Sequence, residues 1–154
     1  MKKLISTIIF VILSGCGFKV INISELNNFS IVDITSSGDK RINYIIKNNI
    51  LFGNKKNQAN QIIINLNTKR NKNVKERNIK NEIIKYNITI NANVALKEII
   101  KEKDYSFTIT RSGSFSTASQ NSTTRNNEKN LISILTKDLA NEILAEIRLK
   151  LNDI

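Results

Sequence analysis

The longest regular pattern in this 154-residue sequence is an alternation of apolar and polar side chains between residues 84 and 94. Successive side chains of an extended strand point to opposite faces, so a period of two predicts one buried face and one polar face. The chain is therefore expected to build a β-sheet that is covered on one side. The apolar positions are Ile84, Tyr86, Ile88, Ile90, Ala92 and Val94, and the polar positions are Lys85, Asn87, Thr89, Asn91 and Asn93.

Other segments supply the partners for this strand. β-branched and aromatic residues over 29–34, 61–67 and 104–115 predict three more strands. Apolar residues at helical spacing predict a short helix from residue 41 and a long one over 122–151. The order β-α-β-β-β-α predicts an α+β fold, a two-layer sandwich with a four-stranded sheet and two helices on one face. The helical positions are Ile42, Ile45, Ile46 and Ile50, then Ile132, Leu135, Leu139, Ile143, Ile147 and Leu151, widened by Leu131, Ile134, Ala140 and Leu144.

The connections are predicted from turn and capping residues. Residues 36–39 offer a helix cap with an acid in the first turn, and Gly53 is expected to close that helix in a left-handed conformation. Residues 69–80 carry many basic side chains without an apolar period, which predicts a basic loop or a frayed hairpin. Residues 96–103 are expected to form a basic connection between two strands.

The N-terminus has the layout of an export signal. Lys2 and Lys3 precede an apolar run over 4–13, and the run ends in Leu13-Ser14-Gly15-Cys16. This tetrad resembles a bacterial lipobox, whose thiol is alkylated with diacylglycerol before cleavage. The alternatives are a transmembrane anchor or an ordinary signal peptide with an incidental cysteine, but a spanning helix needs ~20 apolar residues and polar side chains return at Lys19. We predict a signal peptide over 1–15, a lipidated tether over 16–28 and a single domain over 29–154.

Composition narrows the chemistry. The chain has no His, and its one Cys is the predicted lipidation site, so the commonest metal ligands and the commonest general base are missing from the mature protein. Residues 37–40 spell the Ser-x-x-Lys tetrad of some acyl-enzymes, but they fall on the expected helix cap with no accompanying motif. We therefore expect no enzyme, no metal and no cofactor.

The charge of the chain points to an anionic partner. The formal charge is +11, or +9 once Lys2 and Lys3 are removed (22 Lys and Arg less 13 Asp and Glu). For an exported lipoprotein, anionic lipid or phosphorylated glycolipid is a better-placed partner than nucleic acid. Lys97, Lys101 and Lys103, with Arg111 further along, are the candidate phosphate contacts. The alternative is that the lysines only solvate a surface, as in a chain from an AT-rich genome.

The sequence resembles the LPS-assembly lipoprotein family (LptE, also called RlpB). The resemblance begins at Cys16-Gly17-Phe18, continues through the strand over 86–94, and ends with segment 111–119 leading into a long helix that carries 138–143 and 147–151. The chain departs from the family in having Lys19-Val20 where a proline is common, and in the charged segment 69–80.

The resemblance implies a location and a role. Members of the family are outer-membrane lipoproteins, anchored by diacylglycerol and an N-acyl chain such as palmitate, that face the periplasm and sit as a plug inside the LptD β-barrel. They help that barrel assemble and help deliver lipopolysaccharide to the outer leaflet. Gly17, directly after Cys16, is compatible with sorting to the outer membrane. The alternative function is another envelope lipoprotein that acts as a lipid-binding carrier or a scaffold.

Overall fold

The structure, a computed structural model, describes residues 29–52, 54 and 60–152. The predicted signal peptide, the lipobox, the tether and the expected cap at Gly53 lie outside the described residues. The elements, in chain order, are β1 (Phe29–Gly38), α2 (Lys40–Phe52), β2 (Asn60–Arg77), β3 (Ile83–Glu98), β4 (Lys103–Ser116) and α3 (Asn121–Asn152).

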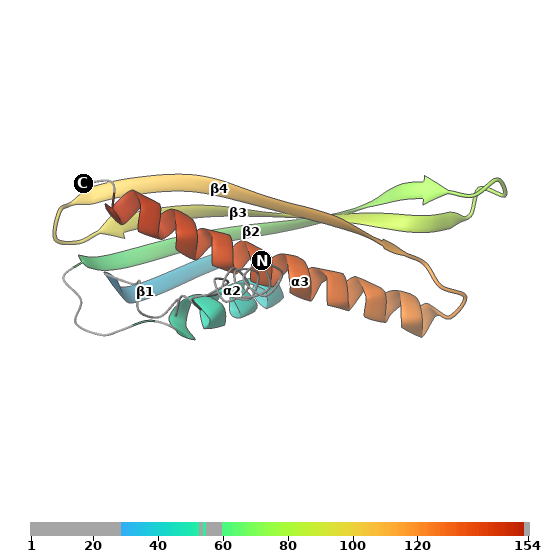
Figure 1. Cartoon of the computed structure of the whole chain (residues 1–154), viewed down its shortest axis with the longest axis horizontal. Helices are drawn as coiled ribbons and strands as arrows, with labels where there is room; N and C mark the ends of the chain where they lie inside the picture. Colours follow the sequence, from blue (N-terminus) through green and yellow to red (C-terminus); the bar gives the residue numbers. More distant parts are fainter. Residues whose placement is uncertain (1–28, 53, 55–59, 153–154) are drawn as a thin grey trace, which may run out of the picture.

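The four strands form one sheet in the order β1-β2-β3-β4. β1 pairs parallel with β2, whereas β2, β3 and β4 pair antiparallel. Both helices cover the same face of the sheet, as Figure 1 shows. The predicted α+β two-layer sandwich and its β-α-β-β-β-α order are therefore confirmed.

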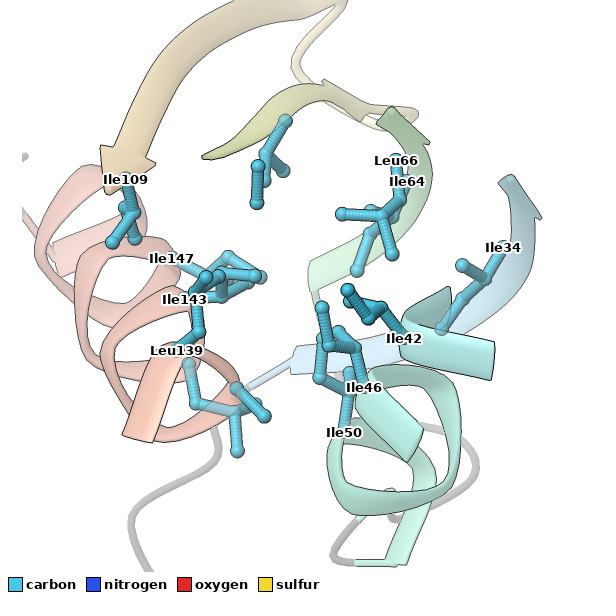
Figure 2. Packing of buried hydrophobic residues seen from close by; sticks show 14 of the residues in the cluster. Ile34, Ile42, Ile46, Ile50, Ile64, Leu66, Ile109, Leu139, Ile143 and Ile147 are labelled. Carbon is cyan, nitrogen blue, oxygen red and sulfur yellow. The ribbon is translucent and has the colours of Figure 1, made fainter. Parts of the chain in front are cut away.

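The core lies between the sheet and the two helices. Figure 2 shows Ile42, Ile46 and Ile50 of α2 facing Leu139, Ile143 and Ile147 of α3, with side chains of the sheet closing the layer. All six are at most 1% exposed. The sequence placed Ile134 on this stripe, but its side chain is 57% exposed because it lies one helical step of about 100° from the buried Leu135.

β1 is longer than its sequence pattern predicts. It continues through residues 36–38, which were expected to be a cap, because each of them pairs with β2 as far as Thr68. Gly38 ends the strand at a φ of 93°, and a Cβ there would lie 1.9 Å from the carbonyl oxygen of Thr68. Only glycine fits this close approach.

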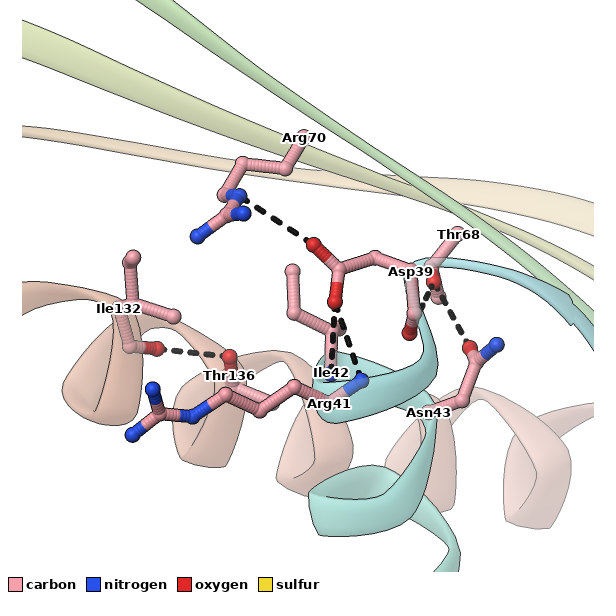
Figure 3. A network of polar contacts seen from close by, with 8 residues as sticks. All are labelled: Asp39, Arg41, Ile42, Asn43, Thr68, Arg70, Ile132 and Thr136. Atoms are coloured by element: carbon pink, nitrogen blue, oxygen red, sulfur yellow. Dashed lines mark hydrogen bonds and ion pairs between the residues drawn. The ribbon is translucent and has the colours of Figure 1, made fainter. Parts of the chain in front are cut away.

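Asp39 is the residue that starts α2. Its Oδ1 accepts hydrogen bonds from the backbone N–H of Arg41 (3.1 Å) and of Ile42 (3.2 Å), which satisfies two donors that the first turn leaves free. Its Oδ2 lies 3.2 Å from Nε of Arg70 on β2 (Figure 3). The predicted acid is present, but it stands at the cap rather than inside the first turn.

A buried hydrogen bond fixes α2 against the sheet. Thr68 Oγ1 donates to Asn43 Oδ1 at 2.7 Å (Figure 3). Asn43 Nδ2 donates to the carbonyl oxygen of Ser37 at 2.8 Å. Just beyond the other end of α2, the Asn54 side chain bonds both the N–H and the carbonyl of Ile31 (2.9 and 3.0 Å). The parallel β1-α2-β2 unit is thus held at both ends of its helix.

The prediction of a loop at 69–80 is wrong, and the hairpin alternative is right. β2 runs to Arg77 and stays paired with β3 through Val74↔Tyr86 and Arg77↔Ile83. The basic connection expected over 96–103 is also mostly strand, since Glu98 pairs with Ile62 on one side and with Lys103 on the other. Only residues 99–102 are left for the turn.

Candidate functional site

The centre of the sheet face opposite the helices is made mostly of uncharged polar side chains. Alternation along each strand turns Asn, Thr and Ser residues to this side while their apolar neighbours face the helices. We call it the polar face. Its central residues are Thr35, Ser37, Asn65, Asn67, Asn91, Asn93, Ser106, Thr108 and Thr110.

Hydrogen bonds between neighbouring strands order these side chains. Thr108 Oγ1 donates to Asn93 Oδ1 at 2.9 Å, and Thr110 Oγ1 donates to Asn91 Oδ1 at 2.7 Å, each pair directly opposite in the β3–β4 register. Asn67 Nδ2 donates to Ser37 Oγ at 2.8 Å in the same manner between β2 and β1. Each amide has further donors or acceptors that remain available, so the polar face can hydrogen-bond a partner without reorganising.

A groove crosses the polar face. It has a volume of about 600 Å³, and a second hollow of about 270 Å³ adjoins it toward the β3–β4 turn, sharing Asn65, Ala95 and Ser106. Both are open to solvent. The groove is lined by amides and hydroxyls with Ala95 and Phe107 among them. Its amides and hydroxyls suit an uncharged hydrogen-bonding surface, such as polar side chains of another protein or the hydroxyls of a sugar.

The part of the β2–β3 hairpin farthest from the β3–β4 turn, residues 69–85, is strongly basic. Seven Lys and Arg against Glu76 and Glu82 give it a net charge of +5. We call it the distal hairpin. It projects at the opposite end of the molecule from the last turns of α3 (Figure 1). Its basic residues are Lys69, Arg70, Lys72, Lys75, Arg77, Lys80 and Lys85.

Two of these cations hold the hairpin to the helical layer. Besides Arg70 with Asp39, Nζ of Lys72 lies 2.6 Å from Oε2 of Glu128 at the start of α3. The same Nζ stands 4.4 Å from the ring centroid of Tyr86, which stacks on Phe115 at 5.6 Å. A cation over an aromatic face and beside a carboxylate is stabilised twice, so Lys72 has a structural role.

The tip of the distal hairpin is ordered by one asparagine. Asn78 Oδ1 accepts from the backbone N–H of Lys80 and of Glu82, both at 2.9 Å, and Asn81 adopts a φ of 62° that asparagine tolerates well. Ile79 is fully exposed there. Within the described chain, Lys69 and Lys80 make no ion pair, so these two cations are available to an anionic ligand.

The candidate phosphate contacts do not converge. Lys97 lies on the outer side of β3, and Lys101 Nζ lies 3.3 Å from the buried carboxylate of Glu98. Lys103 begins β4, whereas Arg111 lies on the helix side of the same strand with Nη2 2.5 Å from Oε2 of Glu142. Lys103 and Arg111 are eight residue steps apart along the strand, roughly 27 Å. The segment 97–104 holds three lysines and three acids, so its net charge is zero.

The other features considered in the sequence form no site in the described residues. Leu13, Ser14, Gly15 and Cys16 precede the described residues. Ser37 lies on the polar face, where it accepts the bond from Asn67, and Lys40 is exposed at the start of α2. Among residues 29–52, 54 and 60–152, no three metal-ligating side chains gather. No helix of that part of the chain is long and apolar enough to cross a bilayer.

The polar face and the distal hairpin differ in how far the sequence predicts them. The polar face was visible in the Asn and Thr of residues 87–93, but its extension over β1, β2 and β4 was not. The distal hairpin was expected only as an alternative to a loop, because its inner side carries Arg70 and Lys72 where apolar residues were sought. The alternation of basic residues with Asn71 and Asn73 was the available signal of a strand.

Known proteins resemble this chain in structure rather than in sequence. No family model and no curated protein matches it. Rare lipoprotein B from Shewanella oneidensis superposes with a TM-score of 0.63 at 12% identity, covering 80% of this chain and 96% of that one. Lipoprotein B from Nitrosomonas europaea gives 0.60 at 17% identity over 86% and 90% of the two chains. A minor lipoprotein from Acinetobacter baumannii gives 0.55 at 13% identity over 79% and 93%. The chain has the fold of rare lipoprotein B, which agrees with the family that its sequence resembles.

Proposed function

We propose that this protein is an outer-membrane lipoprotein, anchored through acyl chains on Cys16, that plugs an LptD-type β-barrel, assists the assembly of that barrel and helps lipopolysaccharide reach the outer leaflet. Its fold, shared with rare lipoprotein B, supports the assignment to the LPS-assembly lipoproteins. The lipobox supports the anchor, since it ends 12 residues before β1 begins at Phe29 (residues 17–28).

The polar face is the observation that best supports the proposal that the protein plugs a barrel. A solvated sheet face usually mixes charges of both signs, whereas the centre of this face presents amides and hydroxyls. The lumen of a large membrane barrel is lined by polar side chains because its apolar side chains face the lipid. Amides and hydroxyls can meet such a wall without leaving a charge unpaired.

The length of the sheet fits a lumen that crosses a membrane. β2 has 18 residues, which extend over roughly 60 Å at 3.3–3.4 Å each. A bilayer measures about 40–45 Å with its headgroups. A molecule anchored at the inner leaflet can therefore place its distal hairpin near the outer leaflet, where the phosphates of lipopolysaccharide lie.

The alternative, a lipid carrier, requires an enclosed apolar cavity. The grooves described above are open and lie on the polar face, while the layer between sheet and helices is filled by side chains such as Ile46 and Ile143 (Figure 2). This arrangement favours the plug over the carrier.

Purification from membranes in mild detergent tests the plug. We expect the tagged protein to bring down one large β-barrel protein at a one-to-one ratio and to resist protease in that complex. The double change Asn91→Asp with Thr110→Asp puts charge on the polar face and should lower the yield of complex; Asn141→Asp on the exposed side of α3 is the control. Recovery of the protein alone, or equal loss with both variants, would contradict the proposal.

Binding of lipopolysaccharide is tested by charge reversal at two places. Lys69→Glu with Lys80→Glu reverses two unpaired cations of the distal hairpin, and Lys97→Glu with Lys103→Glu reverses two of the earlier candidates. If the hairpin holds the phosphates, the first pair weakens binding to lipopolysaccharide and reduces its salt dependence, and the second changes it little. The opposite result would assign the contacts to Lys97, Lys101 and Lys103.

A further inference from the structure

Large exposed apolar side chains gather at one end of the molecule. Phe52, the last residue of α2, is 96% exposed, and Ile100 in the β3–β4 turn is 63% exposed. Leu51, Ile99 and Leu149 at the same end are exposed by 42%, 36% and 59%. We call these five the proximal apolar set. A bulky apolar side chain at the tip of a tight turn contributes nothing to the core and lowers solubility. A set of such side chains indicates a surface that another molecule covers.

The register of the sheet brings the set together. β1 and β2 both begin at this end, since Phe29 pairs with Asn60. The β3–β4 turn lies beside them, because the N–H of Ile99 donates to the carbonyl oxygen of Gln61 at 2.8 Å. The bonds from Asn54 to Ile31 hold the end of α2 at the same place.

The last turns of α3 lie at this end too. Gly113 lies against Leu131, and Arg111 pairs with Glu142, so α3 runs antiparallel to β4. Leu149 is therefore carried toward the start of β4, as Figure 1 shows for the C-terminal turns of the helix. The five side chains come from three separate connections or helix ends that the fold places together.

We propose that this end docks on the surface of the bilayer that holds the lipid anchor, with Phe52 and Ile100 inserted among the lipid headgroups. The inference rests on the proposed acylation of Cys16. Phe29 is the point at which the tether enters the domain, and the 13 steps from Cys16 to Phe29 span about 47 Å at most. The tether thus holds this end close to the membrane at a high effective concentration.

Apolar contact drives this docking, and the β3–β4 turn adds no net charge to it. Lys97, Lys101 and Lys103 are balanced by Glu98, Glu102 and Asp104, so the turn has no net charge to attract anionic headgroups. Docking should consequently depend less on salt than the binding proposed for the distal hairpin.

The absence of Trp from the sequence allows a direct test. The lipidated full-length protein is prepared with one substitution at a time, Phe52→Trp, Ile100→Trp or Ile79→Trp, and reconstituted into vesicles of phosphatidylethanolamine and phosphatidylglycerol with brominated acyl chains. All three sites are exposed, so the fold should tolerate each change, and circular dichroism verifies this. Ile79, at the tip of the distal hairpin, is the control.

We expect the Phe52→Trp and Ile100→Trp proteins to emit at shorter wavelength and to lose most of their fluorescence to bromine, with little change in high salt, while Ile79→Trp keeps the emission of a solvated indole. Equal quenching at all three sites, or none at residues 52 and 100, would overturn the proposal. Protection of these two sites only when a barrel protein is present would also overturn it, by assigning the set to a protein partner. The mass of the same sample reports acylation, so a missing anchor is told apart from failed docking.

Discussion

The carboxylate of Asp39 contacts both the start of α2 and Arg70. One of its oxygens caps α2, and the other lies 3.2 Å from the guanidinium of Arg70 on β2. The contact ties the start of a helix to the strand that continues into the distal hairpin. It therefore positions the basic surface relative to the core.

Changing Asp39 separates its two roles. Asp39→Ala removes the cap and the ion pair, so we expect the free energy of unfolding to fall by about 1–2 kcal/mol. Asn caps a helix as well as Asp does, so Asp39→Asn should lose only the half-exposed ion pair, less than about 1 kcal/mol. Urea unfolding measures both, with the exposed Asp33→Ala as control. Equal losses for Ala and Asn would show that the cap contributes nothing.

Alanine at Gly38 should be far more harmful than alanine at Gly113. At Gly38 it must adopt a φ of 93° and meet a backbone oxygen at 1.9 Å, and we expect a loss of more than about 2 kcal/mol. At Gly113 the new Cβ meets the flexible end of Leu131 at 2.8 Å, which should change stability by about 1 kcal/mol or less. Thermal unfolding of the two variants decides the matter, and a reversed order would refute it.

The same substitution at two threonines tests the buried network. Thr68→Val leaves the Oδ1 of buried Asn43 without its donor, so we expect a loss of about 1–3 kcal/mol. Thr110→Val removes a similar bond to Asn91 on the polar face, where water replaces it, and should have little effect on stability. If both cost the same, burial is not what gives the Thr68 bond its importance.

Glu98 is a buried carboxylate with one ionic partner. It is fully buried, Lys101 lies 3.3 Å away, and neither of its oxygens accepts a hydrogen bond from a described residue. Lys101→Met should therefore destabilise the protein by roughly 1–3 kcal/mol, and adding Glu98→Leu should restore the loss. Lys150→Met, which breaks the exposed pair with Glu146, is the control. A double-mutant cycle without coupling would contradict this account.

Processing of the precursor tests the anchor. Cys16→Ala removes the only thiol that can take the lipid, so the protein should accumulate with residues 1–15 attached and at the higher mass of the precursor. Ser6→Ala, in the apolar stretch, should be processed normally. Normal maturation and membrane extraction of the Cys16→Ala protein would contradict the lipobox assignment.

The sequence predicted elements that obey a simple period and missed those stabilised by distant partners. The alternation ending at Val94 and the stripe through Leu139 and Ile143 both mark contacts with the core, so they were sufficient for the fold class. The strand beyond Thr68 was hidden because Arg70 and Lys72 occupy its inner face. Their carboxylate partners lie 31 and 56 residues away in the chain, and no local pattern shows them.

The candidate site was predictable to a similar extent. A cluster of lysines in the sequence, such as Lys97 to Lys103, indicates an anion site only if neighbouring acids point elsewhere. Here the β3–β4 register sets Lys97 opposite Asp104, and Lys101 pairs with Glu98. The distal hairpin has a surplus of basic residues because it holds only two acids, one of which, Glu76, pairs with Lys85.

β1 pairs with β2 only as far as Thr68, and this has a consequence for solubility. Beyond Thr68 no described strand pairs with the outer edge of β2, so the backbone of residues 69–77 offers hydrogen bonds to any extended chain that approaches. Two copies meeting at these edges would each bring a charge of +5, and the repulsion opposes their pairing. The lysines and arginines of the distal hairpin therefore oppose growth of the sheet from one molecule into the next.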